Sequence, residues 1–292
     1  MKIKSLHHSI FLRLTPFLGE GEARAVVRLL MEHFTGYDSV FVSLHPQTEV
    51  PQNVVNEINT AVNQLLENKP IQYVLGKTVF CELPFIVTES VLIPRQETEE
   101  LTHWVIKENP LARKILDIGT GSGCIAVSLA KNIPNCDVYA VDISQNALKI
   151  AQKNAELNHV KVHFMQHDIF ASDFPCPTDE KFDVIVSNPP YVRQLEKDFM
   201  HRRVLDFEPQ IALFVEDTNP LVFFHAILQF GQKHLADNGK LYFEINEYFG
   251  KEIINLFTTY GYTDSYIKKD IHGKERMVCT TIQNTPKPSS LP

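Results

Sequence analysis

The stretch Lys114–Ala126, KILDIGTGSGCIA, carries the strongest indication of the fold. Its first residues, Lys114 to Ile118, form an apolar run that predicts a buried strand. Gly119, Gly121 and Gly123 follow, and glycine allows a backbone to turn sharply and to approach a ligand closely. The apolar residues after the last glycine predict the start of a helix. A strand, a glycine turn and a helix in this order indicate a nucleoside-binding unit of an α/β protein.

An acidic residue one strand later supports this interpretation. The run Cys136–Asp142 predicts the next strand, and Asp142 ends it, about 20 residues beyond Gly119. In Rossmann-type sites a carboxylate at this point accepts hydrogen bonds from the ribose hydroxyls. A carboxylate that ends an apolar strand also needs a partner, because a buried charge is costly. We therefore expect Asp142 to bind a ribose.

A second motif follows a later apolar run. Phe182–Ser187 predicts a buried strand, and Asn188-Pro189-Pro190-Tyr191 comes directly after it. The two prolines lack N–H donors and fix φ, so the backbone leaves the sheet here and stiffens. The Asn188 side-chain oxygen and the Pro189 carbonyl are acceptors that can hold the two hydrogens of an –NH2 group, and Tyr191 offers a flat face beside it. The motif suits a reaction at an amide or exocyclic amino nitrogen.

Hydrophobic periodicity divides the chain into segments. Residues 1–70 are expected to be helical, because apolar residues recur at helical spacing within 22–34 and 51–66, and Pro51 fits the first position of a helix. Residues 71–97 are expected to form a β-hairpin linker. Residues 98–283 alternate strands and helices, which predicts a doubly wound α/β sheet.

Finer features are expected within that sheet domain. Its last two strands should form an antiparallel hairpin through Gly273, and Ser144 should cap the helix over 145–157. Residues 192–218 are expected to form a long loop. The tail over 284–292 has a composition typical of disorder.

Composition restricts the class of protein. The chain has 292 residues, 44% of them hydrophobic, enough for one large or two smaller globular domains. Its 28 basic and 35 acidic residues give a net charge of −7, which argues against an extended nucleic-acid-binding surface. The five cysteines and twelve histidines lack metal-ligand spacing, so we expect no metal, and reduced thiols in a cytoplasmic protein. No apolar run is long enough to predict a signal peptide or a membrane span.

Together these motifs resemble those of the bacterial peptide chain release factor glutamine methyltransferases, a family of class I S-adenosylmethionine-dependent methyltransferases. The resemblance covers roughly residues 71–281, with a helical N-terminal segment of the expected size. Asn-Pro-Pro-Tyr is shared with DNA adenine methyltransferases, whereas the segment Leu92–Glu99 is more specific to the glutamine enzymes. Gln96 departs from the pattern, because the family usually has proline there. Other matching segments are Phe207–Pro209, Tyr242–Ile245 and Asp270–Arg276.

The resemblance implies a Rossmann-like sheet, S-adenosylmethionine as methyl donor, and methyl transfer to the side-chain amide N5 of a glutamine in the Gly-Gly-Gln motif of a release factor. Residues 1–70 would dock that protein substrate. The implied cofactor-binding residues are Asp117, Gly119, Thr120, Gly121, Ser122, Gly123, Asp142, Asp168, Ile169 and Asn188. The implied catalytic residues are Asn188, Pro189 and Tyr191, and the implied substrate-binding residues are these three with Pro190, Arg95 and Glu97.

Other interpretations of the same residues stay open. Asp117 and Asp168 could serve only as turn formers. An adenine N6 methyltransferase of nucleic acid would use the same Asn-Pro-Pro-Tyr turn, but it needs a base-flipping surface and phosphate contacts. A glutamine methyltransferase that acts on a ribosomal protein is an alternative closely related to the release factor hypothesis. A binding protein that keeps the nucleoside pocket without catalysis is a further alternative, and the intact turn argues against it.

Overall fold

The structure, a computed structural model, describes residues 1–174 and 181–282, so the tail expected to be disordered lies outside the described part. It divides into two compact units. The first comprises Met1–Lys77 with His201–Phe207, and the second comprises the remaining residues from Thr78 onward. Within the described part no helix is long and apolar enough to cross a bilayer.

The first unit is helical, as the periodicity predicts. Its apolar stripes meet in one core, to which α4 contributes Val55, Ile58, Val62 and Leu65 at helical spacing. The helix α4 begins at Gln52, so Pro51 lies one residue before the position expected for it. The helices of this unit are α1 (Ile3–Leu18), α2 (Glu20–Thr35), α3 (Ser39–Leu44), α4 (Gln52–Leu66), α5 (Ile71–Leu75) and α9 (Arg202–Phe207).

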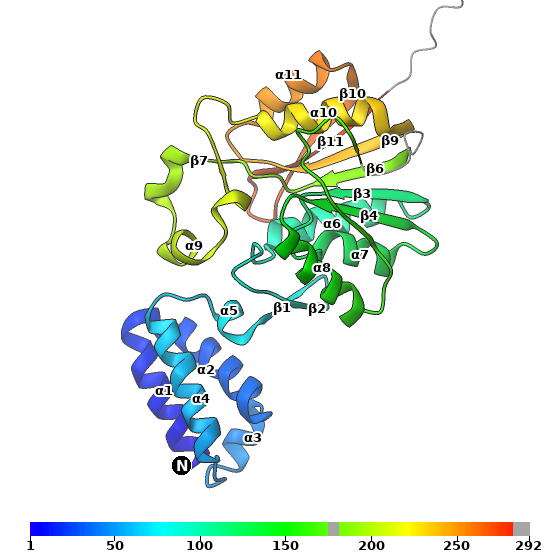
Figure 1. Ribbon diagram of the computed structural model, residues 1–292. Coiled ribbons are helices and arrows are strands. Elements are labelled where there is room, and N and C mark those ends of the chain that lie inside the picture. The colour runs from blue at the N-terminus through cyan, green and yellow to red at the C-terminus, as the bar shows by residue number, and fades with distance from the viewer. Residues whose placement is uncertain (175–180, 283–292) are drawn as a thin grey trace, which may run out of the picture. The chain divides into compact units, whose positions relative to one another are not determined.

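The second unit is built on a seven-stranded sheet with the order β10-β11-β9-β6-β3-β4-β5 (Figure 1). The strands from β9 to β5 are parallel, whereas β11 runs antiparallel to both β9 and β10. The expected terminal hairpin is therefore confirmed. The strands are β3 (Lys114–Ile118), β4 (Asp137–Asp142), β5 (His163–Gln166), β6 (Phe182–Ser187), β9 (Leu235–Glu244), β10 (Tyr262–Lys269) and β11 (Glu275–Ile282).

Helices cover both faces of this sheet (Figure 1), which confirms the doubly wound prediction. Neighbouring residues of one strand point to opposite faces, so Ile115 and Val184 pack in one apolar cluster while Leu116 and Ile185 pack in another. The first cluster receives side chains from α6 (Gln96–Glu108), α7 (Cys124–Asn132) and α8 (Gln145–Leu157). The second receives side chains from α10 (Val222–His234) and α11 (Gly250–Thr259).

The strand order places the two sequence motifs side by side. From β3 the chain passes outward to β4 and β5 and then returns to pair β6 with the other edge of β3. Ile118, which ends β3, is in register with Ser187, which ends β6. In open α/β sheets the crevice at such a reversal is where ligands bind. The glycine turn after β3 and the asparagine turn after β6 both emerge there.

A small hairpin precedes α6. The strands β1 (Lys77–Phe80) and β2 (Leu83–Ile86) form a two-stranded sheet, as expected for the linker. Cys81 and Glu82 between them both have positive φ, which is the geometry of a type I′ turn. The helix α5 at the start of the expected linker was not predicted.

The segment after the asparagine turn is more ordered than the long loop expected over 192–218. Its short strands β7 (Val192–Arg193) and β8 (Phe214–Val215) pair in parallel. Between them lie the 3₁₀ turns η1 (Gln194–Phe199) and η2 (Gln210–Ala212), and α9. Elements of two to six residues carry too little periodicity to be read from a sequence.

Asn154 on α8 and Asn158, which caps the C-terminus of that helix, attach the β1–β2 hairpin to the sheet domain. Buried Asn154 accepts a hydrogen bond from the Ile86 N–H at 2.7 Å and donates to the Ile86 carbonyl at 2.9 Å and to the Ser122 carbonyl at 2.8 Å. Asn158 donates to the Pro84 carbonyl at 2.9 Å. Asn154 therefore joins β2 to the glycine turn.

We predict that Asn154→Ala lowers the free energy of unfolding by about 2–4 kcal/mol, because three buried backbone groups lose their partner. Urea unfolding at neutral pH measures the change. Asn146→Ala, at an exposed position of the same helix, is the matched control and should change stability by less than about 0.5 kcal/mol. Equal stabilities of the two variants would contradict this account of Asn154.

Candidate active site

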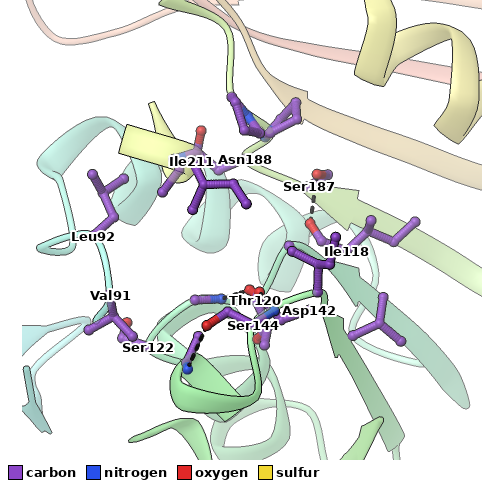
Figure 2. Close-up of a pocket in the computed structure, with 18 of the residues that line it drawn as sticks. Val91, Leu92, Ile118, Thr120, Ser122, Asp142, Ser144, Ser187, Asn188 and Ile211 are labelled. Atoms are coloured by element: carbon purple, nitrogen blue, oxygen red, sulfur yellow. Dashed lines mark hydrogen bonds between the residues drawn. The ribbon is translucent and has the colours of Figure 1, made fainter. Parts of the chain in front are cut away.

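A pocket of about 280 Å³ opens at the carboxyl ends of β3, β4 and β6. Figure 2 shows Asn188 and Ile211 across this pocket from Thr120, Ser122 and Asp142. The sequence-predicted residues that line it are Gly119, Thr120, Gly121, Ser122, Asp142, Asp168, Ile169, Asn188, Pro189, Pro190 and Arg95. Four other predicted residues, Asp117, Gly123, Tyr191 and Glu97, do not line it.

The three glycines of the turn have different roles. All have positive φ, which side chains other than glycine rarely adopt. Beside Gly119 and Gly121 there is open space, so their backbone faces the pocket without obstruction. At Gly123 a Cβ would lie 2.9 Å from the Cβ of Ala151 on α8. Gly123 is therefore required by close packing between α7 and α8 and not by the pocket.

Asp142 closes the pocket at the end of β4. Its Oδ2 accepts from the Gly121 N–H at 2.8 Å, and its Oδ1 accepts from the Ser144 N–H at 2.8 Å. Burial raises the pKa of Asp142, and these backbone N–H groups oppose that shift. Each carboxylate oxygen keeps a further lone pair for a ligand hydroxyl. Ser144 caps α8 as predicted, since its Oγ accepts from the Ala147 N–H at 3.2 Å.

Asp117 lies beneath the glycine turn and is fully buried. Its Oδ2 accepts from the Thr120 hydroxyl at 2.6 Å and from the Ala126 N–H at 3.3 Å, and so fixes the turn between β3 and α7. Its Oδ1 has no partner. Burial raises the pKa of Asp117 to about 7. A buried oxygen without a donor favours a bound group that supplies one.

Asp168 and Ile169 follow β5 and border the pocket from the side of β4. The Asp168 carboxylate accepts from the Phe170 N–H at 3.0 Å, as a turn former does, and the residue is exposed enough to reach a ligand as well. Ile169 and Phe170 add apolar surface to the wall.

Asn188 follows β6 directly and presents its carboxamide at the pocket wall. Its Nδ2 donates to the Thr98 hydroxyl at 3.0 Å. Thr98 donates in turn to Oε2 of Glu244 at 2.6 Å, and the Tyr191 hydroxyl donates to Oε1 of the same carboxylate at 2.8 Å. Tyr191 thus turns its hydroxyl to β9, and burial raises its pKa well above the usual range. Thr98 and Glu244 were not predicted as site residues, although a carboxylate within the apolar run Tyr242–Ile245 was a usable signal.

The segment over residues 92–95, directly before α6, forms another part of the pocket wall. Arg95 lines the pocket and donates to the buried carboxylate of Glu208, which also accepts from the Ile93 N–H at 3.1 Å. Gln96 is the first residue of α6, a position at which proline is favoured but not required. The helix begins there although this chain lacks the proline that the family usually has.

One group of side chains in the described part of the chain has the types and proximity of metal ligands. Ligand atoms of Cys81, Glu99 and His103 lie within 4.8 Å of one another, away from the pocket. The Glu99 carboxylate accepts from the Cys81 N–H, and burial raises the pKa of the Cys81 thiol to about 12.

Comparison with known proteins agrees with the geometry. The sequence-family model of the methyltransferase small domain matches residues 98–206, and that of the PrmC N-terminal domain matches residues 14–76. The release factor glutamine methyltransferase of Flavobacterium psychrophilum is 46% identical over 95% of this chain and 98% of its own length. The enzymes of that name from Bacteroides thetaiotaomicron and Lactococcus lactis are 44% and 40% identical over 88% and 79% of this chain, and over 92% and 83% of their own lengths. The chain belongs to the release factor glutamine methyltransferase family.

Solved structures similar to this chain share its fold. The catalytic domain of hMettl16, solved in complex with MAT2A 3'UTR hairpin 6, aligns with a TM-score of 0.52 over 82% of this chain and 84% of that one. At 14% sequence identity this similarity supports the class I methyltransferase fold alone.

We predict that Asp117 makes the free energy of unfolding fall as pH rises from about 4 to about 7. Its folded pKa of about 7 lies above the ordinary value of 3.8, so the folded state holds a proton that the unfolded state has lost in this range. The slope from one such group approaches about 1.4 kcal/mol per pH unit. Urea unfolding at pH 4.5, 6 and 7.5 measures how the free energy of unfolding changes with pH. In Asp117→Asn this decrease with pH should be smaller by about that amount. Identical pH dependence of parent and variant would refute the assignment.

Proposed function

We propose that this protein transfers a methyl group from S-adenosylmethionine to the side-chain amide N5 of the glutamine in the Gly-Gly-Gln motif of a peptide chain release factor. The observation that carries the proposal is the Asn188 carboxamide at the wall of a nucleoside-sized pocket, beside the glycine turn. Membership of the glutamine methyltransferase family supports the choice of substrate.

The pocket suits S-adenosylmethionine. Asp142 would accept hydrogen bonds from the ribose hydroxyls, and Gly119 and Gly121 let the backbone approach the ligand. Asp168 and Ile169 would border the adenine. The unpartnered oxygen of Asp117, beneath the turn, suits a donor from the methionine end of the cofactor. When bound, the cofactor supplies a methyl group already activated by a positively charged sulfur.

The chain's own residues would act on the amide nitrogen of the substrate. An amide is a weak nucleophile because its lone pair is delocalised, so the nitrogen must become pyramidal to react. The Asn188 oxygen and the Pro189 carbonyl would accept its two hydrogens in that geometry and so bind the transition state better than the planar ground state. Tyr191 does not line the pocket, and its hydroxyl is held by Glu244, so its ring would support the Asn-Pro-Pro-Tyr turn from outside the pocket. Such alignment of the reacting atoms lowers the entropic part of the barrier.

Binding of a protein substrate needs more surface than the pocket supplies. A specific protein interface buries about 800 Å² on each partner. We assign this role to the helical segment over residues 1–70, with Pro190, Arg95 and Glu97 near the mouth of the pocket as further contacts. The net charge of −7 and the absence of basic runs favour a protein over a nucleic acid. Since release factors act in the cytoplasm, the protein would work there.

The decisive experiment incubates the protein and S-adenosylmethionine with a bacterial-type release factor, a ribosomal protein fraction and adenine-containing DNA. Mass spectrometry should find one added methyl group at the Gly-Gly-Gln glutamine, and a release factor with that glutamine changed to alanine should stay unmodified. Efficient transfer to DNA adenine or to a ribosomal protein, with none to the release factor, would replace this proposal by the corresponding alternative.

We predict that Asp142→Ala lowers the affinity for S-adenosylmethionine at least tenfold, because a charge-assisted hydrogen bond of about 1.5–3 kcal/mol is lost. Isothermal titration calorimetry measures the affinity. Asp137→Ala, at the exposed start of the same strand, is the matched control and should leave it unchanged. An unaltered affinity of Asp142→Ala would show that the ribose lies elsewhere.

We predict that Asn188→Ala lowers the rate of methyl transfer by about 10²-fold or more, the usual effect of removing one preorganised polar group. Single-turnover reactions with saturating cofactor isolate this step. Cofactor affinity should change much less, since Asp142 and the glycine turn are untouched. A variant rate equal to that of the parent would refute the acceptor role of Asn188.

A further inference from the structure

A chain of hydrogen bonds leads from the buried end of β9 to the pocket wall. Glu244, which is 1% exposed, receives the Thr98 hydroxyl on one oxygen and the Tyr191 hydroxyl on the other, at 2.6 and 2.8 Å. Thr98, on the first turn of α6, receives the Asn188 amide at 3.0 Å. One carboxylate therefore holds two residues of the Asn-Pro-Pro-Tyr motif, Tyr191 directly and Asn188 through Thr98.

The order of donors in this chain fixes the orientation of the Asn188 carboxamide. An ionised carboxylate can only accept hydrogen bonds, so Thr98 must donate its single hydroxyl hydrogen to Glu244. The Thr98 oxygen can then only accept, and of the two ends of the Asn188 amide only the –NH2 end can meet it. The Asn188 oxygen is consequently turned away from Thr98 and is free to accept from a ligand.

This orientation matters for the reaction proposed above. The amide nitrogen of the substrate carries hydrogens and acts as a donor. An Asn188 oxygen that faces this nitrogen can therefore accept a hydrogen bond from it. The reversed amide would place one –NH2 group against another. Without the bond to Thr98 nothing among the described contacts of Asn188 distinguishes the two orientations.

Both hydroxyls at Glu244 donate to its carboxylate, which is the arrangement that a group able only to accept requires. Burial raises the pKa of Glu244 and the charge of Glu97 adds to that shift, whereas the hydroxyls of Thr98 and Tyr191 and the charge of Arg276 oppose it. The orientation of the amide therefore rests on the donor geometry at Glu244 and Thr98. We propose that Glu244 and Thr98 are positioning residues that hold the Asn188 carboxamide with its oxygen toward the substrate nitrogen. This inference rests on the proposed function.

The kinetic test compares three variants. Thr98→Val removes the hydroxyl at nearly constant volume and should lower the single-turnover rate about tenfold or more at saturating release factor, because misplacement of a reacting group by about 1 Å can cost 10²-fold. Thr98→Ser should recover most of that rate. Thr102→Val is the matched control: it is equally buried one turn later on α6, and its hydroxyl bonds only the Thr98 carbonyl, at 2.8 Å. Its rate should stay within about twofold of the parent.

A coupling measurement separates positioning from general loss of structure. In an Asn188→Ala background, Thr98→Val should cost little further rate, because its effect passes through Asn188. The affinity for S-adenosylmethionine should change less than threefold in every Thr98 variant. A parental rate in Thr98→Val, or an equal loss with and without Asn188, would overturn the proposal.

A second readout needs neither substrate nor a folded Thr98→Val variant. The side-chain ¹⁵N–¹H₂ resonances of Asn188, assigned by their disappearance in Asn188→Asp, should show one hydrogen protected from exchange in the parent protein. Two rapidly exchanging hydrogens would overturn the positioning role. If the parent fails to methylate a release factor, the proposed function fails, and this spectrum still decides whether Thr98 holds the amide.

Discussion

The parallel pairing of β3 with β6 is the constraint on which the site depends. It sets Ile118 opposite Ser187, and the Ser187 hydroxyl adds a bond of 2.7 Å to the Ile118 carbonyl at the last rung. The glycine turn and the Asn-Pro-Pro-Tyr turn start from these two residues, so neither can move without the other. A shift of one residue along β6 would turn its side chains to the opposite faces of the sheet and displace Asn188 from the pocket.

The same edge of the sheet collects carboxylates that a stable core alone would not include. Asp117, Asp142 and Glu244 lie at or next to the ends of β3, β4 and β9, and burial raises the pKa of each. Each accepts from hydroxyl or backbone donors, and among the described residues no lysine or arginine forms an ion pair with it. Such carboxylates cost stability but supply fixed acceptors, and the reaction proposed above would use acceptors for ribose hydroxyls and for the hydrogens of an amide.

The sequence predicted those parts of the structure that depend on local chemistry. The strands around the glycine turn, the Ser144 cap and the terminal hairpin follow from periodicity and from short motifs, and the structure confirms them. The parts it missed depend on contacts between distant segments. Nothing near Thr98 in the sequence shows that its hydroxyl meets Glu244, 146 residues later, and the pairing of β7 with β8 joins segments of two residues. Asp117, Gly123 and Tyr191 were expected at the site but do not line the pocket, because their positions depend on contacts that the sequence does not show.

The segment Leu92–Glu99, which carries the more specific part of the resemblance to the glutamine enzymes, has contacts at both of its ends. At one end, the Ile93 N–H and Arg95 are held by Glu208, and Pro209 and Ile211, which follow Glu208 in the chain, also line the pocket. At the other end, Thr98 carries the bond that orients Asn188. The segment thus connects the wall of the pocket to the acceptor of the Asn-Pro-Pro-Tyr turn.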